Sequence, residues 1–200
     1  MMKKKINTSA IINLLLVVIV GVLAFVPDTR AWVGRGLMKI GLFKPDLEHG
    51  VVKEEESRPT HTDMRAPVLF ADGNGNRIDA ANQTGKVVFV NFWATWCPPC
   101  IAEMPSIDKL YQRFKDNPQV VFIMADVDGD YEKSKRFMAG RKLGLPVHVP
   151  AGKIPDHWLG GAVPTTVILD KQGRIAARHE GMADYSRPEV TAFIQQLLSQ

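Results

Sequence analysis

Residues 64–200 are predicted to form an α/β domain, in which a central mixed β-sheet carries helices on both faces. Val87 to Trp93 is a nearly continuous run of β-branched and aromatic residues, which is typical of a strand buried on both sides. After Pro98 the spacing of apolar residues changes to that of a helix. Thr165–Leu169 and Arg174–His179 are predicted to be two strands joined by a turn at Asp170–Gly173, which indicates an antiparallel hairpin.

The remaining elements of the domain follow from the same kinds of pattern. Pro67–Phe70 and Arg77–Asp79 flank the segment Asp72–Asn76, which is rich in glycine and asparagine, and together they predict an added N-terminal β-hairpin. Val120 to Val127 is a second buried strand, joined to the first by a crossover helix and therefore parallel to it. The next helix begins near Asp130, and Ser186–Glu189 forms a capping box that opens the final helix. Parallel strands and a C-terminal hairpin together make the sheet mixed.

The N-terminal region has the order of charges and apolar residues that is typical of an export signal. Residues 1–9 form a basic tail that stays in the cytoplasm, and residues 10–31 are predicted to be a single transmembrane signal-anchor. A cleaved signal peptide is the alternative, with Thr29–Ala31 as an imperfect cleavage site. Residues 32–63 are a membrane-proximal segment and polar linker. The domain is then held at the cell membrane, on the periplasmic or extracytoplasmic side.

Charge and cysteine content exclude several classes of function. The formal net charge is +4, and it is only +1 without Lys3–Lys5, so the composition gives no support for nucleic-acid binding. There are two cysteines, which is too few for a structural disulfide framework. The five histidines are scattered with no pair at ligand spacing, so we predict no metal site and no other cofactor.

The two cysteines, Cys97 and Cys100, are three residues apart at the predicted start of a helix. This spacing allows a chain to cycle between a dithiol and an internal disulfide. Unpaired backbone N–H groups at the helix start favour the thiolate of Cys97, whereas Cys100 lies further into the helix and is more shielded. Cys97 is therefore the expected nucleophile and Cys100 the resolving thiol.

The sequence around these cysteines resembles the thioredoxin superfamily. Val90–Cys100, followed by Glu103-Met104-Pro105 and later by Val163–Thr166, is similar to the TlpA/ResA-like branch of membrane-tethered, extracytoplasmic thiol-disulfide oxidoreductases. The similarity covers roughly residues 64–200. It implies a thioredoxin-like fold for this domain.

The resemblance also implies roles for residues around the cysteines. Pro164 would be a cis-proline that faces the disulfide and presents its neighbouring backbone to an extended substrate. Trp96, Pro98, Pro99 and Val163 would contact the substrate. A cis X-Pro bond is a minority state unless the fold enforces it, so this expectation comes from the family motif alone.

One departure from thioredoxin affects proton transfer. Thioredoxin has a buried aspartate that assists the second cysteine, and this chain has Asn91 there, which cannot ionise. Glu103 lies three residues after Cys100, on the same side of the helix, and is the candidate proton shuttle. The alternative is an acidic residue favoured only by the helix dipole.

The pair Pro98-Pro99 carries no charge that would stabilise a thiolate, so we expect a protein near the reducing end of the superfamily. Its partners would be disulfide-containing exported proteins, with cytochrome c maturation as the leading possibility in this branch. A membrane electron donor would have to re-reduce it. The alternatives are a tethered peptide-binding module and a peroxiredoxin-like peroxidase.

Overall fold

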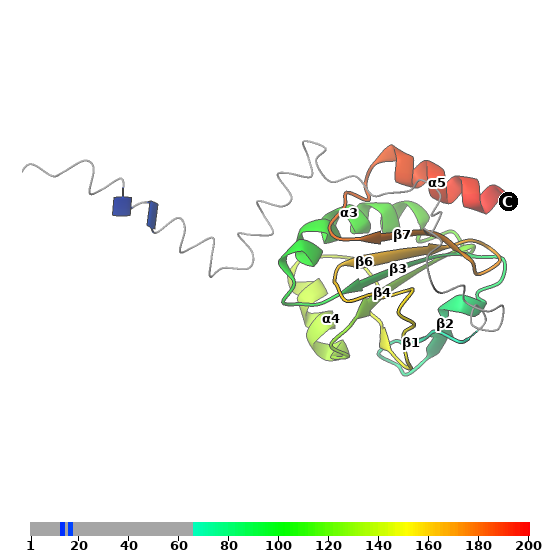
Figure 1. Ribbon diagram of the computed structural model, residues 1–200, viewed down its shortest axis with the longest axis horizontal. Helices are drawn as coiled ribbons and strands as arrows, with labels where there is room; N and C mark the ends of the chain where they lie inside the picture. The colour runs from blue at the N-terminus through cyan, green and yellow to red at the C-terminus, as the bar shows by residue number, and fades with distance from the viewer. Residues whose placement is uncertain (1–12, 15, 18–65) are drawn as a thin grey trace, which may run out of the picture.

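The computed structural model describes residues 13–14, 16–17 and 66–200 (Figure 1). The domain contains two β-sheets and three α-helices, with a short 3-10 helix after the N-terminal hairpin. In chain order the elements are β1 (Leu69–Ala71), β2 (Arg77–Asp79), η2 (Ala80–Asn82), β3 (Val87–Trp93), α3 (Pro98–Phe114), β4 (Val120–Asp126), α4 (Tyr131–Gly140), β5 (Val149–Pro150), β6 (Thr165–Leu169), β7 (Ile175–Glu180) and α5 (Pro188–Ser199).

The central sheet is mixed, as predicted, and its strand order is β4-β3-β6-β7. β3 and β4 are parallel, with Val87 opposite Val120, whereas β6 is antiparallel to both β3 and β7. Every residue of β3 is buried, because this strand lies inside the sheet and both of its faces are covered. The unbroken apolar sequence of β3 therefore reflects its central place.

The two faces of the sheet are covered by different kinds of structure. Alternate residues of β3, such as Phe89 and Trp93, pack in one buried cluster with side chains of α3, α4 and α5. Their neighbours, such as Val88 and Phe92, pack in a second cluster with the N-terminal hairpin and Trp158. Within the described residues this second cluster has no side chain from α3, α4 or α5.

The predicted arrangement of helices on both faces is therefore wrong in part. The second face is covered by a small sheet of order β2-β1-β5, together with η2. Val68 and Phe70 supply the apolar side chains that a helix would otherwise contribute there. The added N-terminal hairpin itself is confirmed, with Phe70 opposite Ile78.

The start of α5 also differs from the prediction. Its N-cap residue is Arg187, which makes no side-chain capping bond with the described residues, so Ser186 does not form a capping box. The Ser186 hydroxyl instead donates to Asp184 Oδ1 at 2.7 Å. A short-range side-chain bond of this kind competes directly with capping.

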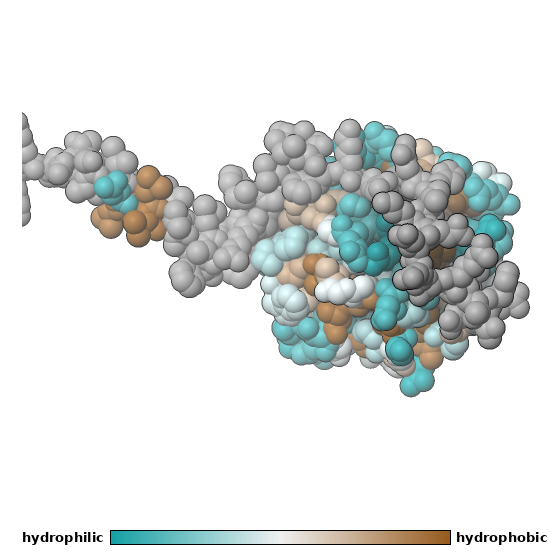
Figure 2. Space-filling view, in the orientation of Figure 1, coloured by the Kyte–Doolittle hydropathy of each residue, from teal (hydrophilic) through white to brown (hydrophobic). Residues whose placement is uncertain are grey.

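Most of the N-terminal predictions lie outside the described residues, namely the basic tail 1–9, most of the anchor 10–31 and the linker 32–63. The described residues 13–14 and 16–17 are helical and exposed, and apart from Asn13 they are apolar (Figure 2). Among the residues that the structure describes, no helix has the length and apolar content needed to cross a bilayer.

Candidate active site

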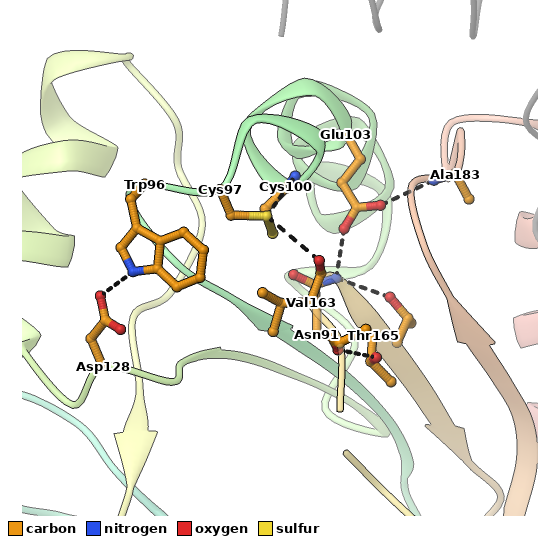
Figure 3. Close-up of a disulfide and its surroundings, with 11 residues drawn as sticks. Asn91, Trp96, Cys97, Cys100, Glu103, Asp128, Val163, Thr165 and Ala183 are labelled. Atoms are coloured by element: carbon orange, nitrogen blue, oxygen red, sulfur yellow. Dashed lines mark hydrogen bonds between the residues drawn. A yellow bond between two sulfur atoms is a disulfide. The ribbon is translucent and has the colours of Figure 1, made fainter. Parts of the chain in front are cut away.

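The two cysteines form a disulfide at the junction between β3 and α3 (Figure 3). Their Cα atoms are 5.3 Å apart. The backbone turns after Trp93, where Cys97 N–H donates to the carbonyl of Ala94 at 3.2 Å. Cys97 retains 2% of its surface and Cys100 none, so in the disulfide form only Cys97 offers any surface to a partner.

Cys97 occupies the N-cap position of α3, which confirms the predicted placement at a helix start. Its sulfur accepts a hydrogen bond from the backbone N–H of Cys100 at 3.3 Å. Pro98 follows in the first turn, where a missing N–H costs nothing. Neither Pro98 nor Pro99 has an N–H, so it is the Cys100 N–H, together with the helix dipole, that would stabilise negative charge on the Cys97 sulfur once the disulfide is reduced.

The loop before β6 lies against the disulfide. The peptide bond between Val163 and Pro164 is cis, as the family resemblance implied. The carbonyl oxygen of Val163 is 3.7 Å from Cys97 Sγ. The next carbonyl, that of Pro164, accepts the Gly181 N–H at 2.8 Å, which ties this loop to the end of β7.

All four of the predicted substrate-contacting residues keep some exposed surface. Trp96 is 59% exposed and Pro99 is exposed, whereas Pro98 and Val163 are half-buried. These side chains come from the β3–α3 junction and the loop before β6, which are far apart in sequence. The structure thus brings together one partly apolar surface next to Cys97.

Glu103 is fully buried on α3, one turn beyond Cys100. Its Oε1 accepts from Asn91 Nδ2 at 2.8 Å, and its Oε2 accepts from the backbone N–H of Ala183 at 3.1 Å. Burial raises the pKa of Glu103 to about 8, and the two donated hydrogen bonds only partly oppose this effect. A carboxyl group with this pKa exchanges protons near neutral pH.

Sequence reasoning missed several partners of the predicted residues. Asn91 Nδ2 also donates to Thr166 Oγ1 at 2.9 Å, and Trp96 Nε1 donates to Asp128 Oδ2 at 2.8 Å. Thr166 lies within the Val163–Thr166 motif, so the sequence did indicate that this residue is near the site. Asp128 and Ala183 lie in loops with no such signal.

Among the described residues, the arrangement offers a redox-active pair of cysteines. Within the described part of the chain, no group of three or more His, Cys, Asp or Glu residues is placed to hold a metal ion. The disulfide, the helix start and the neighbouring backbone of Val163 are the features that could react with or bind a partner.

The comparisons with known proteins agree with this geometry. The Redoxin family model matches residues 53–194. Thiol-disulfide oxidoreductase ResA of Bacillus cereus is 32% identical over 130 residues, which covers 64% of this chain and 73% of the relative. The ResA protein of Oceanobacillus iheyensis is 27% identical over 188 residues, which covers 94% of this chain and 88% of the relative.

A solved structure is also similar. The crystal structure of a putative thiol-disulfide oxidoreductase from Bacteroides vulgatus shares 25% sequence identity with this chain, with a TM-score of 0.55. The match covers 66% of this chain and 92% of that structure. Since the family model spans more than half of the chain, the chain belongs to the Redoxin family, and with its reactive pair at Cys97 and Cys100 it is a ResA-like thiol-disulfide oxidoreductase of the thioredoxin superfamily.

Proposed function

We propose that this protein reduces disulfides in exported proteins at the extracytoplasmic face of the membrane. The observation that carries the proposal is the Cys97–Cys100 disulfide at the N-terminus of α3, next to the backbone of Val163. In this position Cys97 Sγ can be attacked when it is oxidised and can attack when it is reduced. Cys100 Sγ is held within bonding distance of it.

The reaction balances as two exchange steps. The Cys97 thiolate attacks one sulfur of the substrate disulfide, and the bond between the two substrate sulfurs breaks as the new mixed disulfide forms. The leaving sulfur departs as a thiolate and takes a proton from water. Cys100 then loses its proton and attacks Cys97 Sγ, which restores the internal disulfide and releases the second substrate thiol. Two electrons pass from this protein to the substrate.

The second step needs a group that accepts the Cys100 proton, and Glu103 is our candidate. At pH 7–8 a carboxyl group whose pKa is about 8 is partly ionised and is therefore able both to accept and to return a proton. Glu103 follows Cys100 by one helical turn. Asn91, which replaces an ionisable residue, holds Glu103 by a hydrogen bond at 2.8 Å.

The substrate would bind as an extended segment across the loop before β6. The Val163 side chain is half-buried and its carbonyl lies 3.7 Å from Cys97 Sγ, so a backbone lying along Val163 would bring its own cysteine to Cys97. Trp96, Pro98 and Pro99 would contact the side chains that flank the cysteine. Pro164 would set the direction in which this backbone is presented.

The direction of electron flow follows from the chemistry between the cysteines. Pro98 and Pro99 bring no positive charge that would stabilise the reduced form, so the disulfide should resist reduction and the dithiol should donate electrons readily. Re-reduction then requires a membrane electron donor. Haem-binding cysteines of apocytochrome c are the candidate substrate.

Equilibration with glutathione buffers should place the reduction potential of the Cys97–Cys100 couple nearer to about −270 mV than to about −120 mV, and a value at the oxidising end would reverse the proposed direction.

The decisive experiment is a trapping variant in the native cell. With Cys100→Ser, the mixed disulfide at Cys97 cannot be resolved, so exported proteins should remain covalently attached to the chain until a reductant is added. Cys97→Ser is the matched control and should trap none. Insulin reduction by wild type and loss of that activity in Cys100→Ser would exclude a pure peptide-binding module. Peroxide consumption without insulin reduction would instead indicate a peroxidase.

A further inference from the structure

Trp96 is the most exposed tryptophan described, yet its indole is held in place by a specific bond. Its Nε1 donates to Asp128 Oδ2 at 2.8 Å, although 59% of the residue surface is open to solvent. In Figure 3 the indole nitrogen points to the Asp128 carboxylate, and the rest of the ring system extends toward Val163. Hydrogen bonds to a carboxylate are stronger than neutral ones, so this bond restricts the ring effectively.

The carboxylate that holds Trp96 is itself on a well-supported loop. Asp126 is fully buried at the end of β4, and its two carboxylate oxygens accept the backbone N–H groups of Asp128 and Asp130, each at 3.3 Å. The Ser134 hydroxyl donates to the same carboxylate at 2.8 Å. Backbone amides of residues 128 and 130 are thus fixed on either side of Gly129. The carboxylate that accepts from Trp96 therefore belongs to a loop whose backbone is hydrogen-bonded to Asp126.

We propose that Asp128 is a positioning residue, which holds the exposed indole of Trp96 at one place beside Cys97 so that polypeptide substrates with apolar side chains next to their disulfide meet a preformed contact surface. The inference rests on the proposed function and adds to it a preference among substrates. Asp128 touches neither cysteine in the contacts described and acts through Trp96.

The physical basis is the cost of ordering a side chain on binding. An unrestrained tryptophan on the surface samples several rotamers, and docking a peptide against it would have to fix one of them. A bond that already fixes the ring removes this cost before the substrate arrives. A small disulfide that reaches only the sulfurs gains nothing from the same restraint.

The test compares two substrates in the full chain. Initial rates of reduction are measured for insulin, which presents polypeptide around its disulfides, and for hydroxyethyl disulfide, which does not. Asp128→Ala should lower the ratio of the two kcat/KM values about two- to tenfold, mainly through a higher KM for insulin. The serine side chain in Asp128→Ser is too short to reach the indole, so this variant should lower the ratio by the same amount. It replaces Asp128→Ala in the test if that variant folds poorly. Asp128→Asn keeps an acceptor oxygen and should lower the ratio less.

Two further variants separate a specific role from structural damage. Lys133 Nζ lies 3.9 Å from the same oxygen of Asp128, so Lys133→Met removes the neighbouring charge and leaves the bond to Trp96. This variant should keep the wild-type ratio. Trp96→Phe should lower the ratio by itself, and adding Asp128→Ala to it should lower the ratio no further, because the group that Asp128 positions is already missing.

A spectroscopic readout completes the test. The indole N–H resonance of Trp96 is identified by its absence in Trp96→Phe, and its exchange with water should be faster in Asp128→Ala than in wild type. Three outcomes would each overturn this inference while leaving the proposed function intact. They are an unchanged ratio of the two kcat/KM values in Asp128→Ala, unchanged exchange of the Trp96 indole N–H in that variant, and a ratio that Asp128→Ala lowers as much in the Trp96→Phe background as in wild type. A wild-type chain that reduces neither substrate would overturn the proposed function, and this inference with it.

Discussion

At the scale of single residues, the contacts of Asn91 suit a neighbour that changes its protonation state. Both hydrogens of its amide nitrogen are used, toward Glu103 Oε1 and Thr166 Oγ1, while its oxygen has no hydrogen-bond partner in the described part of the chain. Rotating the Asn91 side-chain amide by half a turn would exchange the positions of its donor nitrogen and its acceptor oxygen. The oxygen could then accept from a protonated Glu103 and from the Thr166 hydroxyl. An aspartate at position 91 could not pair with an ionised Glu103 in this way.

We expect Glu103→Gln to change how Cys100 responds to pH. The variant is close in shape, and a turned Asn91 amide can accept from its new amide group, so the fold should be retained. In a Cys97→Ser background, the alkylation rate of Cys100 by iodoacetamide should show an inflection near pH 8 when Glu103 is present, because ionisation of Glu103 changes the charge beside the thiol. In Glu103→Gln this inflection should disappear. Superimposable pH profiles would remove Glu103 from the proton-transfer step.

The same carboxyl group makes stability depend on pH. Its pKa is about 8 in the folded chain and 4.5 in the reference state, so between these values the unfolded chain loses a proton that the folded chain keeps. The stabilisation from the bound proton is complete below pH 4.5 and is lost as pH rises through about 8. Relative to wild type, Glu103→Gln should gain stability over this window, on the order of 5 kcal/mol at its upper end. Urea unfolding at a series of pH values measures this, and a constant difference between the two proteins would contradict it.

The two cysteines and the candidate proton shuttle could be predicted from the sequence, but the hydrogen-bond partners around them could not. Cys97, Cys100 and Glu103 lie within seven residues of one another, so helical spacing alone related them. The backbone donor to Glu103 comes from Ala183, 80 residues away, and the hydroxyl beside Asn91 comes from Thr166, 75 residues away. Contacts of this kind depend on which loops the sheet brings together.

At the scale of elements, prediction succeeded where a segment had a regular pattern of its own. β3 and the start of α3 were predicted at their observed bounds, because a buried strand and a helix with proline in its first turn have distinctive sequences. β5 was missed, since it is only Val149–Pro150 and pairs with β1 through two residues. A strand of this length has no periodicity that a sequence could show.

The turn between β6 and β7 provides a stability test with an internal control. Gly173 has φ +77°, and a Cβ there would overlap the backbone carbonyl oxygen of Ala81. Gly75, in the turn of the N-terminal hairpin, has φ +80° with nothing within 4 Å of the corresponding position. Gly75→Ala should cost about 1–2 kcal/mol for the backbone conformation alone. Gly173→Ala should cost roughly 1–3 kcal/mol more, because backbone atoms cannot move aside as a side chain can.

Thermal or urea unfolding of the two glycine variants gives the comparison. The informative quantity is the difference between them, since both share the cost of a positive φ. Equal losses of stability would show that η2, which carries Ala81, shifts easily away from the turn. The close packing of η2 against this hairpin would then not contribute to stability.

At the scale of the whole molecule, the topology explains why distant segments meet at the cysteines. β3 and β4 are parallel, so their carboxyl ends lie at one edge of the sheet, and the loops that follow them carry Trp96 and Asp128. β6 is antiparallel to β3, so its amino end lies at this same edge and carries Val163 and Pro164. A mixed sheet with this order therefore places the sulfur pair, the exposed indole and the backbone proposed to bind substrate together.

The proposed place of the domain at a membrane is tested in the full chain. If residues 10–31 are an uncleaved anchor, the protein should sediment with membranes, resist extraction by alkaline carbonate and dissolve only with detergent. A double variant with Leu14→Arg and Leu16→Arg places two charges in the apolar stretch, each costing about 2.5–3.5 kcal/mol at the centre of a spanning helix, and should no longer be retained. Gly75→Ala, which lies in the domain, serves as the control and should fractionate like wild type. A mature chain that begins after Ala31 and is recovered in the carbonate-soluble fraction would show instead that the segment is a cleaved signal peptide, because the remaining residues would no longer include the apolar stretch.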